Sequence, residues 1–514
     1  MIDATPVLRL YARRRLAALA ALDPVAAQER QLLALLARAR DTRFGRAHGF
    51  ARLGSVADFQ KAVPLRRYEE FWREWWQPAF PRLDGVTWPG RIPYLATTSG
   101  TTSGISKYVP VSPAMVRSNR RAALDLLVHH LANRPESRIL GGRNFMLGGS
   151  AALARQAPGV TSGDLSGIVV NEVPAWARPW YFPPRRLALI GDWEAKVADL
   201  APRSLGAGIR SISGTPSWLL LFFERLAALR PDRPPVLASW YPRLEMIAHG
   251  GVAFAPYRRR FAALLEGSRA ELREVYPTSE GFVAVADRAS GEGLRMILDN
   301  GLFLEFVPVG ELDAASPTRH WLATLETGID YALVLSSCAG LWSYVLGDVV
   351  RVVGRDPPRL VVAGRTSYFL SAFGERVDGE EIDTAVTAAA EAVGTTVSDY
   401  AMGPLYPAAP GERGGHLFVV EPDRPLSPDE QARFLAVLDA TLARLNLDYR
   451  DHRAGDFGMR PPALLVAPPG GFAAWMKSQG KLGGQHKVPR VIADEGRLQE
   501  LAGFVGRLPW ECRR

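Results

Sequence analysis

The sequence predicts an α/β fold: a large N-terminal domain with mixed and parallel sheets flanked by helices, and a smaller, mobile α+β C-terminal domain. Up to about residue 370, short apolar runs alternate with glycine turns and helical periodicity, which is typical of strand, turn and helix units. Beyond that point an alanine-rich composition with three short apolar runs indicates a small α+β domain. A chain of 514 residues is too long for one core. We therefore expect two domains, at residues 1–368 and 369–514.

The N-terminal 40 residues carry basic side chains among Leu and Ala at helical spacing, which predicts an amphipathic helix that packs on its own domain. They contain no uninterrupted apolar stretch with a small-residue cleavage site. No run of about 18 apolar residues indicates a membrane span. Two cysteines, Cys338 and Cys512, form neither a disulfide framework nor a metal-ligand pattern. These observations predict a cytoplasmic protein without a membrane partner.

The net charge of +9 comes mostly from arginines that occur singly or in short groups, such as those at 13–15 and 258–260. No zinc-finger, RRM or KH pattern accompanies them, so we expect no nucleic-acid partner. An anionic small substrate accounts equally well for a modest positive excess.

A loop rich in glycine and hydroxyl groups follows the apolar residues 92–96. It reads Thr98-Ser99-Gly100-Thr101-Thr102-Ser103-Gly104, and Lys107 follows it. Glycine lets backbone N–H groups converge on one point, hydroxyls add donors, and a lysine supplies a charge for polyphosphate. A flexible Ser/Gly linker is the alternative, but the apolar flanks and the lysine favour a phosphate loop. With the helical pattern from Pro113 to Leu131, the sequence predicts a strand, loop and helix.

Lysine is rare in this chain. Of 62 basic Lys and Arg residues only six are lysines, at positions 61, 107, 196, 477, 481 and 487. A compact ammonium differs from the planar guanidinium fork, so each lysine is a candidate for a position that arginine cannot fill. Lys481 and Lys487 lie in a glycine-rich stretch that cannot be a packed core element, although chance clustering is the alternative. We expect this stretch to be a mobile loop of the C-terminal domain that brings a lysine to the N-terminal domain.

Three further turns carry candidate residues. One strand pattern ends at Gly250-Gly251, and the strand at 272–276 ends at Pro277-Thr278-Ser279-Glu280-Gly281. Asp348 lies at a Gly-Asp turn between apolar strands. Ligands bind beyond the carboxyl ends of parallel strands, and we expect the first two of these turns at such ends. For Glu280 and Asp348, a carboxylate that only caps a turn is the alternative.

Prolines and large aromatic residues interrupt the pattern between Val173 and Pro184. This segment, with Trp180 and Tyr181, either lines a substrate pocket or covers the edge of a sheet. The helix that contains Leu127 is a second candidate wall. Aromatic walls favour an aryl or another bulky apolar substrate.

Taken in their order along the chain, these motifs resemble those of the adenylate-forming enzymes (the ANL superfamily). The loop at 98–104 with Lys107 resembles the phosphate loop of that superfamily, residues 276–280 its Tyr-x-x-Ser/Thr-Glu motif, and residues 344–348 its Tyr-x-x-Gly-Asp motif. Gly364-Arg365, followed by residues 374–377, resembles the hinge into the mobile C-terminal domain.

Within that superfamily the chain resembles the GH3 acyl-acid amido synthetases, and we expect a bacterial type. This closer resemblance rests on residues 90–94, 216–219 and 485–490. It implies a ligase that activates a carboxylic acid as acyl-AMP, releases pyrophosphate, and transfers the acyl group to an amine, in particular that of an amino acid. An acid–thiol (acyl-CoA) ligase and a catalytically decayed nucleotide-binding protein are the alternatives. The implied cofactors are ATP and Mg²⁺, and a monomer or dimer is expected.

The resemblance also implies roles for residues. The β- and γ-phosphates would be held by Thr98, Ser99, Gly100, Thr101, Thr102, Ser103 and Lys107. The adenine would lie on the side of Tyr276, Thr278 and Ser279. Asp348 would bind the ribose hydroxyls, and Arg365 would support the ribose or the hinge. Glu280 would help to hold Mg²⁺. Lys487, or else Lys481, would stabilise charge on the α-phosphate. Gly250, Gly251, Trp180, Tyr181 and Leu127 would contact the acyl substrate.

Two positions depart from the family pattern. Val345 stands where an arginine usually follows the tyrosine of the Gly-Asp motif, so Arg351 is a candidate to supply that contact. Glu375-Arg376 stands in place of the usual Asp-Lys pair after the hinge.

Overall fold

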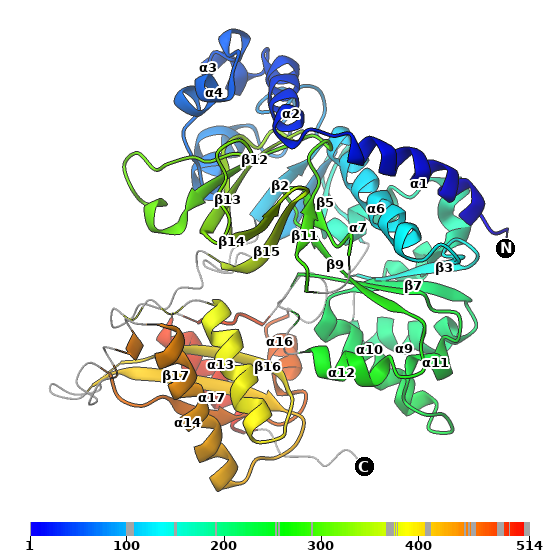
Figure 1. Cartoon of the computed structure of the whole chain (residues 1–514), viewed down its shortest axis with the longest axis vertical. Coiled ribbons are helices and arrows are strands. Elements are labelled where there is room, and N and C mark those ends of the chain that lie inside the picture. Colours follow the sequence, from blue (N-terminus) through cyan, green and yellow to red (C-terminus); the bar gives the residue numbers. More distant parts are fainter. Residues whose placement is uncertain are drawn as a thin grey trace. The chain divides into compact units, whose positions relative to one another are not determined.

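A computed structural model describes residues 2–98, 107–148, 152–190, 193–251, 254, 257–288, 291–365, 375, 377, 379–406, 413–446, 449–450, 453, 459–480, 488–492 and 494–507. The chain folds as two compact units (Figure 1). The N-terminal unit comprises residues 1–251 and 265–362, and the C-terminal unit comprises residues 252–264 and 363–514. The segment 252–264 thus belongs to the C-terminal unit although it is flanked in sequence by residues of the N-terminal unit.

The helices of the N-terminal unit are α1 (Thr5–Ala20), α2 (Pro24–Ala39), α3 (Arg43–Ala47), α4 (Val56–Ala62), α5 (Tyr68–Phe71), α6 (Pro113–Asn133), α7 (Leu165–Asn171), α8 (Arg185–Ala188), α9 (Trp193–Leu205), α10 (Pro216–Leu229) and α11 (Leu237–Trp240). Its strands are β1 (Tyr94–Thr98), β2 (Lys107–Val111), β3 (Arg143–Leu147), β4 (Ala154–Ala157), β5 (Val160–Gly163), β6 (Tyr181–Phe182), β7 (Ile209–Gly214), β8 (Met246–His249), β9 (Glu271–Pro277), β10 (Phe282–Val285), β11 (Leu294–Met296), β12 (Leu302–Pro308), β13 (Asp330–Ser337), β14 (Tyr344–Arg355) and β15 (Pro358–Arg365), the last of which runs across the boundary between the units.

The large sheet of this unit has 11 strands in the order β12-β13-β14-β15-β11-β10-β9-β8-β7-β3-β6. Strands β3, β7, β8 and β9 are parallel neighbours, whereas β12, β13 and β14 pair antiparallel, as do β9, β10 and β11. A second sheet has the order β2-β1-β5-β4. The mixture of parallel and antiparallel pairing confirms the predicted α/β class.

Helices cover both faces of the parallel strands (Figure 1). On one face, Met246 and Ala248 of β8 share a buried cluster with residues of α1 and α6. On the other, the ring of Phe145 in β3 lies 5.0 Å from that of Phe222 in α10. Alternate strand residues therefore point to opposite helical layers, and the strands are buried on both sides.

The N-terminal segment folds as two helices, where the sequence predicts one. The first helix ends at Ala20, and Asp23 caps the second, since its carboxylate accepts the N–H of Ala26 at 2.9 Å and Pro24 occupies the first helical position. Such a pair starts a helix and cannot continue one. Leu8 and Ala12 of α1 are buried against α6, so packing on the helix's own domain is confirmed.

The tryptophan-rich stretch after α5 forms a short π-helix at Trp72–Trp76. Phe71 and Trp76 are fully buried, with their rings 5.0 Å apart, in the main core of the unit. This placement agrees with a packing role for the aromatic cluster.

The C-terminal unit is an α+β structure. Its three-stranded sheet has the order β16-β17-β18, formed by Val397–Leu405, Gly415–Pro422 and Ala463–Val466. Its helices are α12 (Arg258–Leu264), α13 (Gly379–Ala392), α14 (Pro428–Leu445), α16 (Gly471–Ser478) and α17 (Glu495–Val505). Buried residues of α13 and α14 pack together with Tyr400 and Phe418 of the sheet, which gives this unit its own core.

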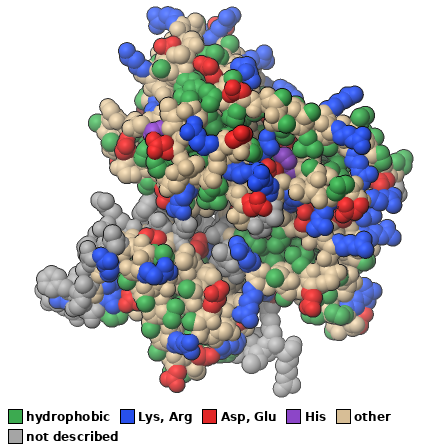
Figure 2. All heavy atoms as spheres, in the orientation of Figure 1, with side chains coloured by type: hydrophobic (Ala, Val, Ile, Leu, Met, Phe, Trp, Pro, Cys, Tyr) green, Lys and Arg blue, Asp and Glu red, His purple; other side chains and the backbone are tan. Residues whose placement is uncertain are grey.

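Among the helices of the described residues, none is both long and apolar enough to cross a membrane. On the face shown in Figure 2, Lys and Arg side chains are spread among acidic ones.

Candidate active site at the carboxyl edge of the parallel strands

Strands β3, β7, β8 and β9 run in the same direction, so their carboxyl ends meet at one edge of the sheet. Gly148, Thr215, Gly250 and Thr278 follow these four strands. Gly250 abuts β9 closely, because a Cβ atom there would lie 2.1 Å from the carbonyl oxygen of Val275. Only glycine fits this approach, and Gly251 adopts φ +88°, which also favours glycine. The paired glycines are therefore required by the backbone at this edge.

The turn after β9 is a tight hairpin, since Pro277 of β9 is the register partner of Phe282 of β10. The hydroxyl of Thr278 closes the turn: it donates to the carbonyl of Gly281 at 3.0 Å and accepts the N–H of Glu280 at 3.2 Å. Ser279 is buried and Glu280 is half-buried. Glu280 is thus held on a rigid turn at the edge where the sequence predicts it.

Asp348 lies within the continuous strand β14, where the sequence predicts a turn between two strands. Ala332 of β13 pairs with Val349 and Val334 pairs with Val345, so residues 346–348 bulge opposite a single residue of β13. Gly347 has φ +88° and makes this bulge possible. The predicted turn is therefore wrong: Gly347 forms a β-bulge within β14, and the strand continues past it.

The bulge brings Asp348 to Tyr276. The hydroxyl of Tyr276 donates to the Asp348 carboxylate at 2.6 Å, and each side chain is only 7% exposed. Strands β15, β11 and β10 separate β14 from β9 in the sheet order, so this contact requires the sheet to fold over on itself. Two motifs 72 residues apart in sequence therefore share one hydrogen bond at the candidate site.

Lys107 lies at the first position of β2, directly opposite Thr98 of β1. The loop is thus a connection between two antiparallel strands, and α6 begins after β2 at Pro113, where the sequence predicts a helix. The Lys107 ammonium lies 3.0 Å from a carboxylate oxygen of Glu69 and 4.9 Å from the ring centroid of Tyr68. Burial alone would raise the pKa of Glu69, but the hydrogen bond with Lys107, a backbone hydrogen bond and the charges of Lys107 and Arg67 together lower it.

Several predicted site residues lie outside the described residues: Ser99, Gly100, Thr101, Thr102, Ser103, Lys481 and Lys487. For Thr98 and Arg365 the structure describes only the backbone, which ends β1 and β15 respectively.

Trp180 and Tyr181 lie away from the carboxyl edge. Tyr181 is the register partner of Asn144, near the start of β3, and the Trp180 indole N–H donates to the carbonyl of Leu140 at 2.9 Å. Strand β6 is thereby the outermost strand of the sheet. The sequence predicts either a wall of a substrate pocket or a cover over the edge of a sheet, and this placement favours the cover.

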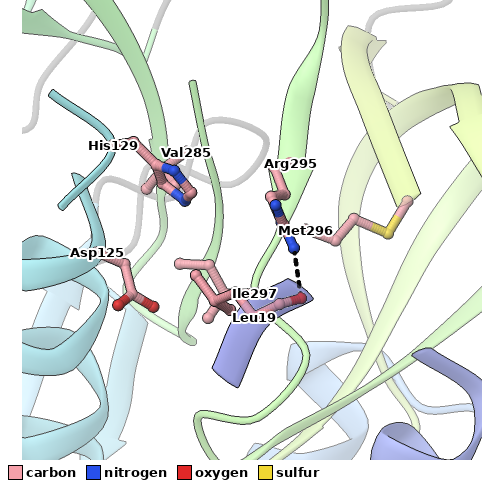
Figure 3. Close-up of a pocket in the computed structure, with 7 residues that line it drawn as sticks. All are labelled: Leu19, Asp125, His129, Val285, Arg295, Met296 and Ile297. Carbon is pink, nitrogen blue, oxygen red and sulfur yellow. Dashed lines mark hydrogen bonds between the residues drawn. The ribbon is translucent and has the colours of Figure 1, made fainter. Parts of the chain in front are cut away.

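Leu127 packs beside the buried cluster formed by α1, α6, β8 and β10. A small cavity lies near this cluster and is lined by Leu19, Asp125, His129, Val285, Arg295, Met296 and Ile297 (Figure 3). The guanidinium of Arg295 donates to the Leu19 carbonyl at 3.0 Å, and burial lowers the pKa of His129 to about 4. The cavity includes none of the predicted site residues.

Of the residues that depart from the family pattern, the structure describes Val345 and Glu375, whereas Arg376 lies outside the described residues. Val345 is buried against β12 and β13. Arg351 forms a bidentate salt bridge with Asp330 across the β13–β14 pair. Its Nε and Nη2 atoms donate to the two carboxylate oxygens at 2.8 and 2.9 Å. Glu375 is fully buried, and its carboxylate lies 2.8 Å from Nε2 of His416.

One buried residue at this edge was not assigned to the site from sequence. Lys196 in α9 is 2% exposed, and its ammonium donates to the carbonyls of Gly148 at 3.0 Å and Ala188 at 3.4 Å. It therefore holds the residue that follows β3. Burial lowers its pKa to about 8, although nearby Asp164 opposes the shift. The scarcity of lysine in the sequence was the available signal.

Lys196 gives a pH-dependent stability difference. Between pH 8 and 10.5 the unfolded chain keeps a proton that the folded chain has released, so higher pH favours folding. We expect the free energy of unfolding of the native protein, relative to Lys196→Met, to rise by about 2 kcal/mol from pH 7.5 to pH 10. Urea unfolding of both proteins at the two pH values measures this. An equal difference at both pH values would contradict it, since Lys196 is the ionisable group that distinguishes the two proteins.

Comparison with known protein families gives three matches. The GH3 family N-terminal domain matches residues 17–197, the GH3 family central domain residues 295–365, and the GH3 family C-terminal domain residues 380–496. The central match contains Asp348, and the C-terminal match contains Lys481 and Lys487.

A curated relative and two solved structures are similar to this chain. The probable indole-3-acetic acid-amido synthetase GH3.9 of Oryza sativa subsp. japonica is 28% identical over 325 residues, which cover 59% of this chain and 71% of the rice protein. The structure of GH3.15 acyl acid amido synthetase superposes with a TM-score of 0.79 at 18% identity, covering 98% of this chain and 97% of that one. The structure of 2-hydroxyisobutyryl-CoA ligase in its postadenylation state superposes with a TM-score of 0.62 at 15% identity, covering 94% and 92%.

At these identities the two structures show a shared fold and no more, and they confirm the predicted ANL-like architecture. The three family matches lie in the order N-terminal, central and C-terminal, and together they take up most of the chain. The protein therefore belongs to the GH3 family of acyl acid amido synthetases.

Proposed function

We propose that this GH3 synthetase activates a carboxylic acid with ATP and joins it to the amine of an amino acid. The observation that carries the proposal is the buried hydrogen bond between Tyr276 and Asp348. The bond joins the Asp348 carboxylate to the hydroxyl of Tyr276, which lies two residues before the turn that holds Glu280. A carboxylate can accept hydrogen bonds from ribose hydroxyls, and an aromatic ring can lie against a base.

Two displacements make up the reaction. A carboxylate oxygen of the acid attacks the α-phosphorus of ATP, the bond from phosphorus to the bridging oxygen breaks, and pyrophosphate leaves. The amine nitrogen then attacks the acyl carbon, the carbon–oxygen bond to AMP breaks, and the nitrogen loses a proton. Activation is needed because a carboxylate oxygen is otherwise a poor leaving group.

In the proposed assignment, Asp348 accepts hydrogen bonds from the ribose hydroxyls. A carboxylate can accept about four, so the bond from Tyr276 does not exclude them. Tyr276 lies against adenine, with Thr278 and Ser279 shaping the turn beside it, and Arg365 braces the ribose or the hinge. Residues 98–104 and Lys107 bind the β- and γ-phosphates, with Glu69 and Tyr68 holding the lysine in place. Gly250 and Gly251 bring the backbone close to the acyl group.

Magnesium is compatible with the residues at this site. Among the described residues no group of three or more acidic, His or Cys side chains could hold a metal ion alone. Mg²⁺ commonly uses one or two carboxylates and takes its other ligands from phosphates and water, which fits Glu280 on its rigid turn. When bound, the ion would neutralise phosphate charge.

Lys487 is assigned to the developing charge on the α-phosphate, with Lys481 as the alternative. We propose that a C-terminal domain from about residue 369 carries these lysines. Leu127 remains a proposed acyl-pocket residue, whereas for Trp180 and Tyr181 the position on the outermost strand supports the role of a cover over the sheet edge. A bacterial type, a cytoplasmic location and a monomeric or dimeric state also stay proposals; the rice relative described above comes from a plant.

Pyrophosphate exchange tests the proposal. We expect labelled pyrophosphate to enter ATP only in the presence of Mg²⁺ and at least one acid from a panel of aryl and fatty acids. The active acid is then incubated with ATP, amino acids and coenzyme A, and the products are weighed by mass spectrometry. An amide is expected. A thioester alone would favour the acid–thiol ligase, and absence of acid-dependent exchange across the panel would refute the proposed adenylation.

A further inference from the structure

Two segments that are far apart in the sequence meet at Leu140, in the loop between α6 and β3. The indole N–H of Trp180 donates to the Leu140 carbonyl at 2.9 Å, and the N–H of Ala4 donates to the same carbonyl at 3.3 Å. Figure 1 shows the start of α1 near β3. The start of α1 and the short 3-10 helix at Ala175–Trp180 therefore border the same loop.

Both segments carry large apolar side chains that are exposed to solvent. On the side of α1, Ile2 is 81% exposed, Val7 72% and Leu10 56%. In the 3-10 helix, Trp176 is 76% exposed, and Tyr181 of the edge strand β6 is 39% exposed. Most exposed apolar residues on a folded protein occur singly, whereas these five lie on elements that meet at one loop.

The helix α1 has two apolar faces. Leu8 and Ala12 are buried against α6, which accounts for one face. Val7, Leu10 and Tyr11 recur at the spacing i, i+3 and i+4, so they share a different face, and all three are exposed. Packing within the domain therefore explains only half of the apolar character of α1.

The charges on these segments are positive. Residues 4–22 and 173–190 contain arginines at positions 9, 13–15, 178, 185 and 186 and no acidic residue. Arg13, Arg14 and Arg178 are exposed, as are the arginines at 185 and 186. In the loop itself, Arg138 is 64% exposed although it pairs with Asp3, and Glu136 is an exposed acid. We call the exposed apolar residues and arginines of residues 2–18 and 176–186 the Leu140 surface.

This composition matches one class of partner. Helices with an exposed apolar face flanked by arginine lie in the plane of a membrane interface, where Trp and Tyr rings also settle. Anionic headgroups attract arginine, which gives the surface charge complementarity with an acidic bilayer. A second copy of this chain is less suitable, because it would bring arginines against arginines with no acid in either segment to pair them.

We propose that the Leu140 surface binds anionic phospholipid headgroups and holds the protein on a membrane surface. Trp176, Val7 and Leu10 enter the headgroup layer, and the arginines pair with lipid phosphates. The sequence predicts no membrane partner because it contains no spanning segment, but binding at the interface requires none. Membrane binding is independent of the proposed reaction, so either can fail without the other.

Vesicle sedimentation of the full-length protein tests the proposal. We expect the protein to sediment with vesicles of phosphatidylcholine and phosphatidylglycerol, and to stay in solution with phosphatidylcholine alone. Raising the salt from about 0.05 M to about 0.5 M should weaken binding at least ~10-fold, because exposed charges are screened. No binding to the anionic vesicles at low salt would overturn the proposal.

Two double variants test the surface itself. Val7→Ser with Trp176→Ser removes apolar area and is expected to weaken partitioning onto anionic vesicles ~30-fold. Arg13→Gln with Arg14→Gln removes two charges and is expected to weaken it by a similar factor, ~30-fold. All four side chains are exposed, so the circular dichroism spectrum and the thermal midpoint should keep their native values.

Matched controls carry the same kinds of change elsewhere. Val353→Ser with Leu445→Ser replaces two exposed apolar residues outside the Leu140 surface. Arg225→Gln with Arg433→Gln removes two exposed helical arginines and gives the same net charge as the arginine variant above. Both controls should bind anionic vesicles within about twofold of the native protein. Equal losses in controls and test variants would mean attraction by net charge alone and would refute a defined surface.

The other possible occupants give different results. Sedimentation equilibrium without lipid should show the same mass for the native protein and for Val7→Ser with Trp176→Ser. If the native protein dimerises and this variant does not, the surface joins two copies and the lipid assignment is wrong. Poly-L-glutamate is the probe for an acidic protein partner. If it binds as tightly as the anionic vesicles and with the same loss in both test variants, the lipid assignment is also wrong.

Discussion

Replacing Lys487 by alanine is expected to lower the rate of acid-dependent pyrophosphate exchange about 10²- to 10³-fold while the KM for ATP stays almost unchanged. The reason is that an ammonium placed on developing charge stabilises the transition state more than the bound substrate. Removing one such donor from an enclosed site typically costs a factor of this size. Exchange rates at saturating and limiting ATP measure the two quantities separately.

Lys481→Ala is the matched control, because it removes the same charge six residues earlier in the same glycine-rich stretch. We expect a loss of less than about fivefold in exchange. The reverse result, a large loss for Lys481→Ala and native exchange for Lys487→Ala, would move the role to Lys481. Similar small losses in both variants would contradict a catalytic lysine in this stretch.

Replacing Asp348 by alanine is expected to raise the KM for ATP about 100-fold. The carboxylate would lose its charged hydrogen bonds to the ribose hydroxyls, each of which contributes about 1.5–3 kcal/mol. The variant also leaves the buried Tyr276 hydroxyl without its 2.6 Å partner. Initial rates of exchange at varied ATP give the KM, and the thermal midpoint reports the structural cost.

Tyr276→Phe separates the two effects in that variant. It removes the hydroxyl that orients Asp348 and keeps the ring, so we expect the KM for ATP to rise less than about tenfold. Adding Tyr276→Phe to Asp348→Ala should raise the KM for ATP little further, because the hydrogen bond between the two residues is already lost. If Asp348→Ala destabilises the protein but leaves the KM for ATP at its native value, Asp348 only supports the bulge and the ribose assignment is wrong.

Much of the fold follows from local patterns. The helix α6 and the strands β8 and β9 lie where apolar periodicity and glycine turns predict them. Their ends carry turn or capping residues, such as Ser112 before α6. The break between α1 and α2 was missed, although the Asp23-Pro24 pair is a sufficient local signal.

The candidate site could be predicted only in part. Gly250 and Thr278 lie at the expected edge because parallel strands end together, a rule that needs only the strand order. Trp180 was harder to place: prolines and aromatic residues suit a pocket wall and a covered sheet edge equally well. Which of these occurs depends on β6 pairing with β3, and no local pattern encodes that pairing.

The sequence by itself determined which chemical groups are present, their order, and the family to which they belong, since glycines, hydroxyls and lysines at fixed spacing specify local backbone shapes and local chemistry. Only the tertiary structure decided that Asp348 lies on a bulge against Tyr276, that Glu69 holds Lys107, and that Trp180 and the start of α1 meet at Leu140. Each of these is a contact between residues far apart in the chain. Such contacts depend on how sheets curve and which surfaces are buried together, and these are properties of the whole packed chain.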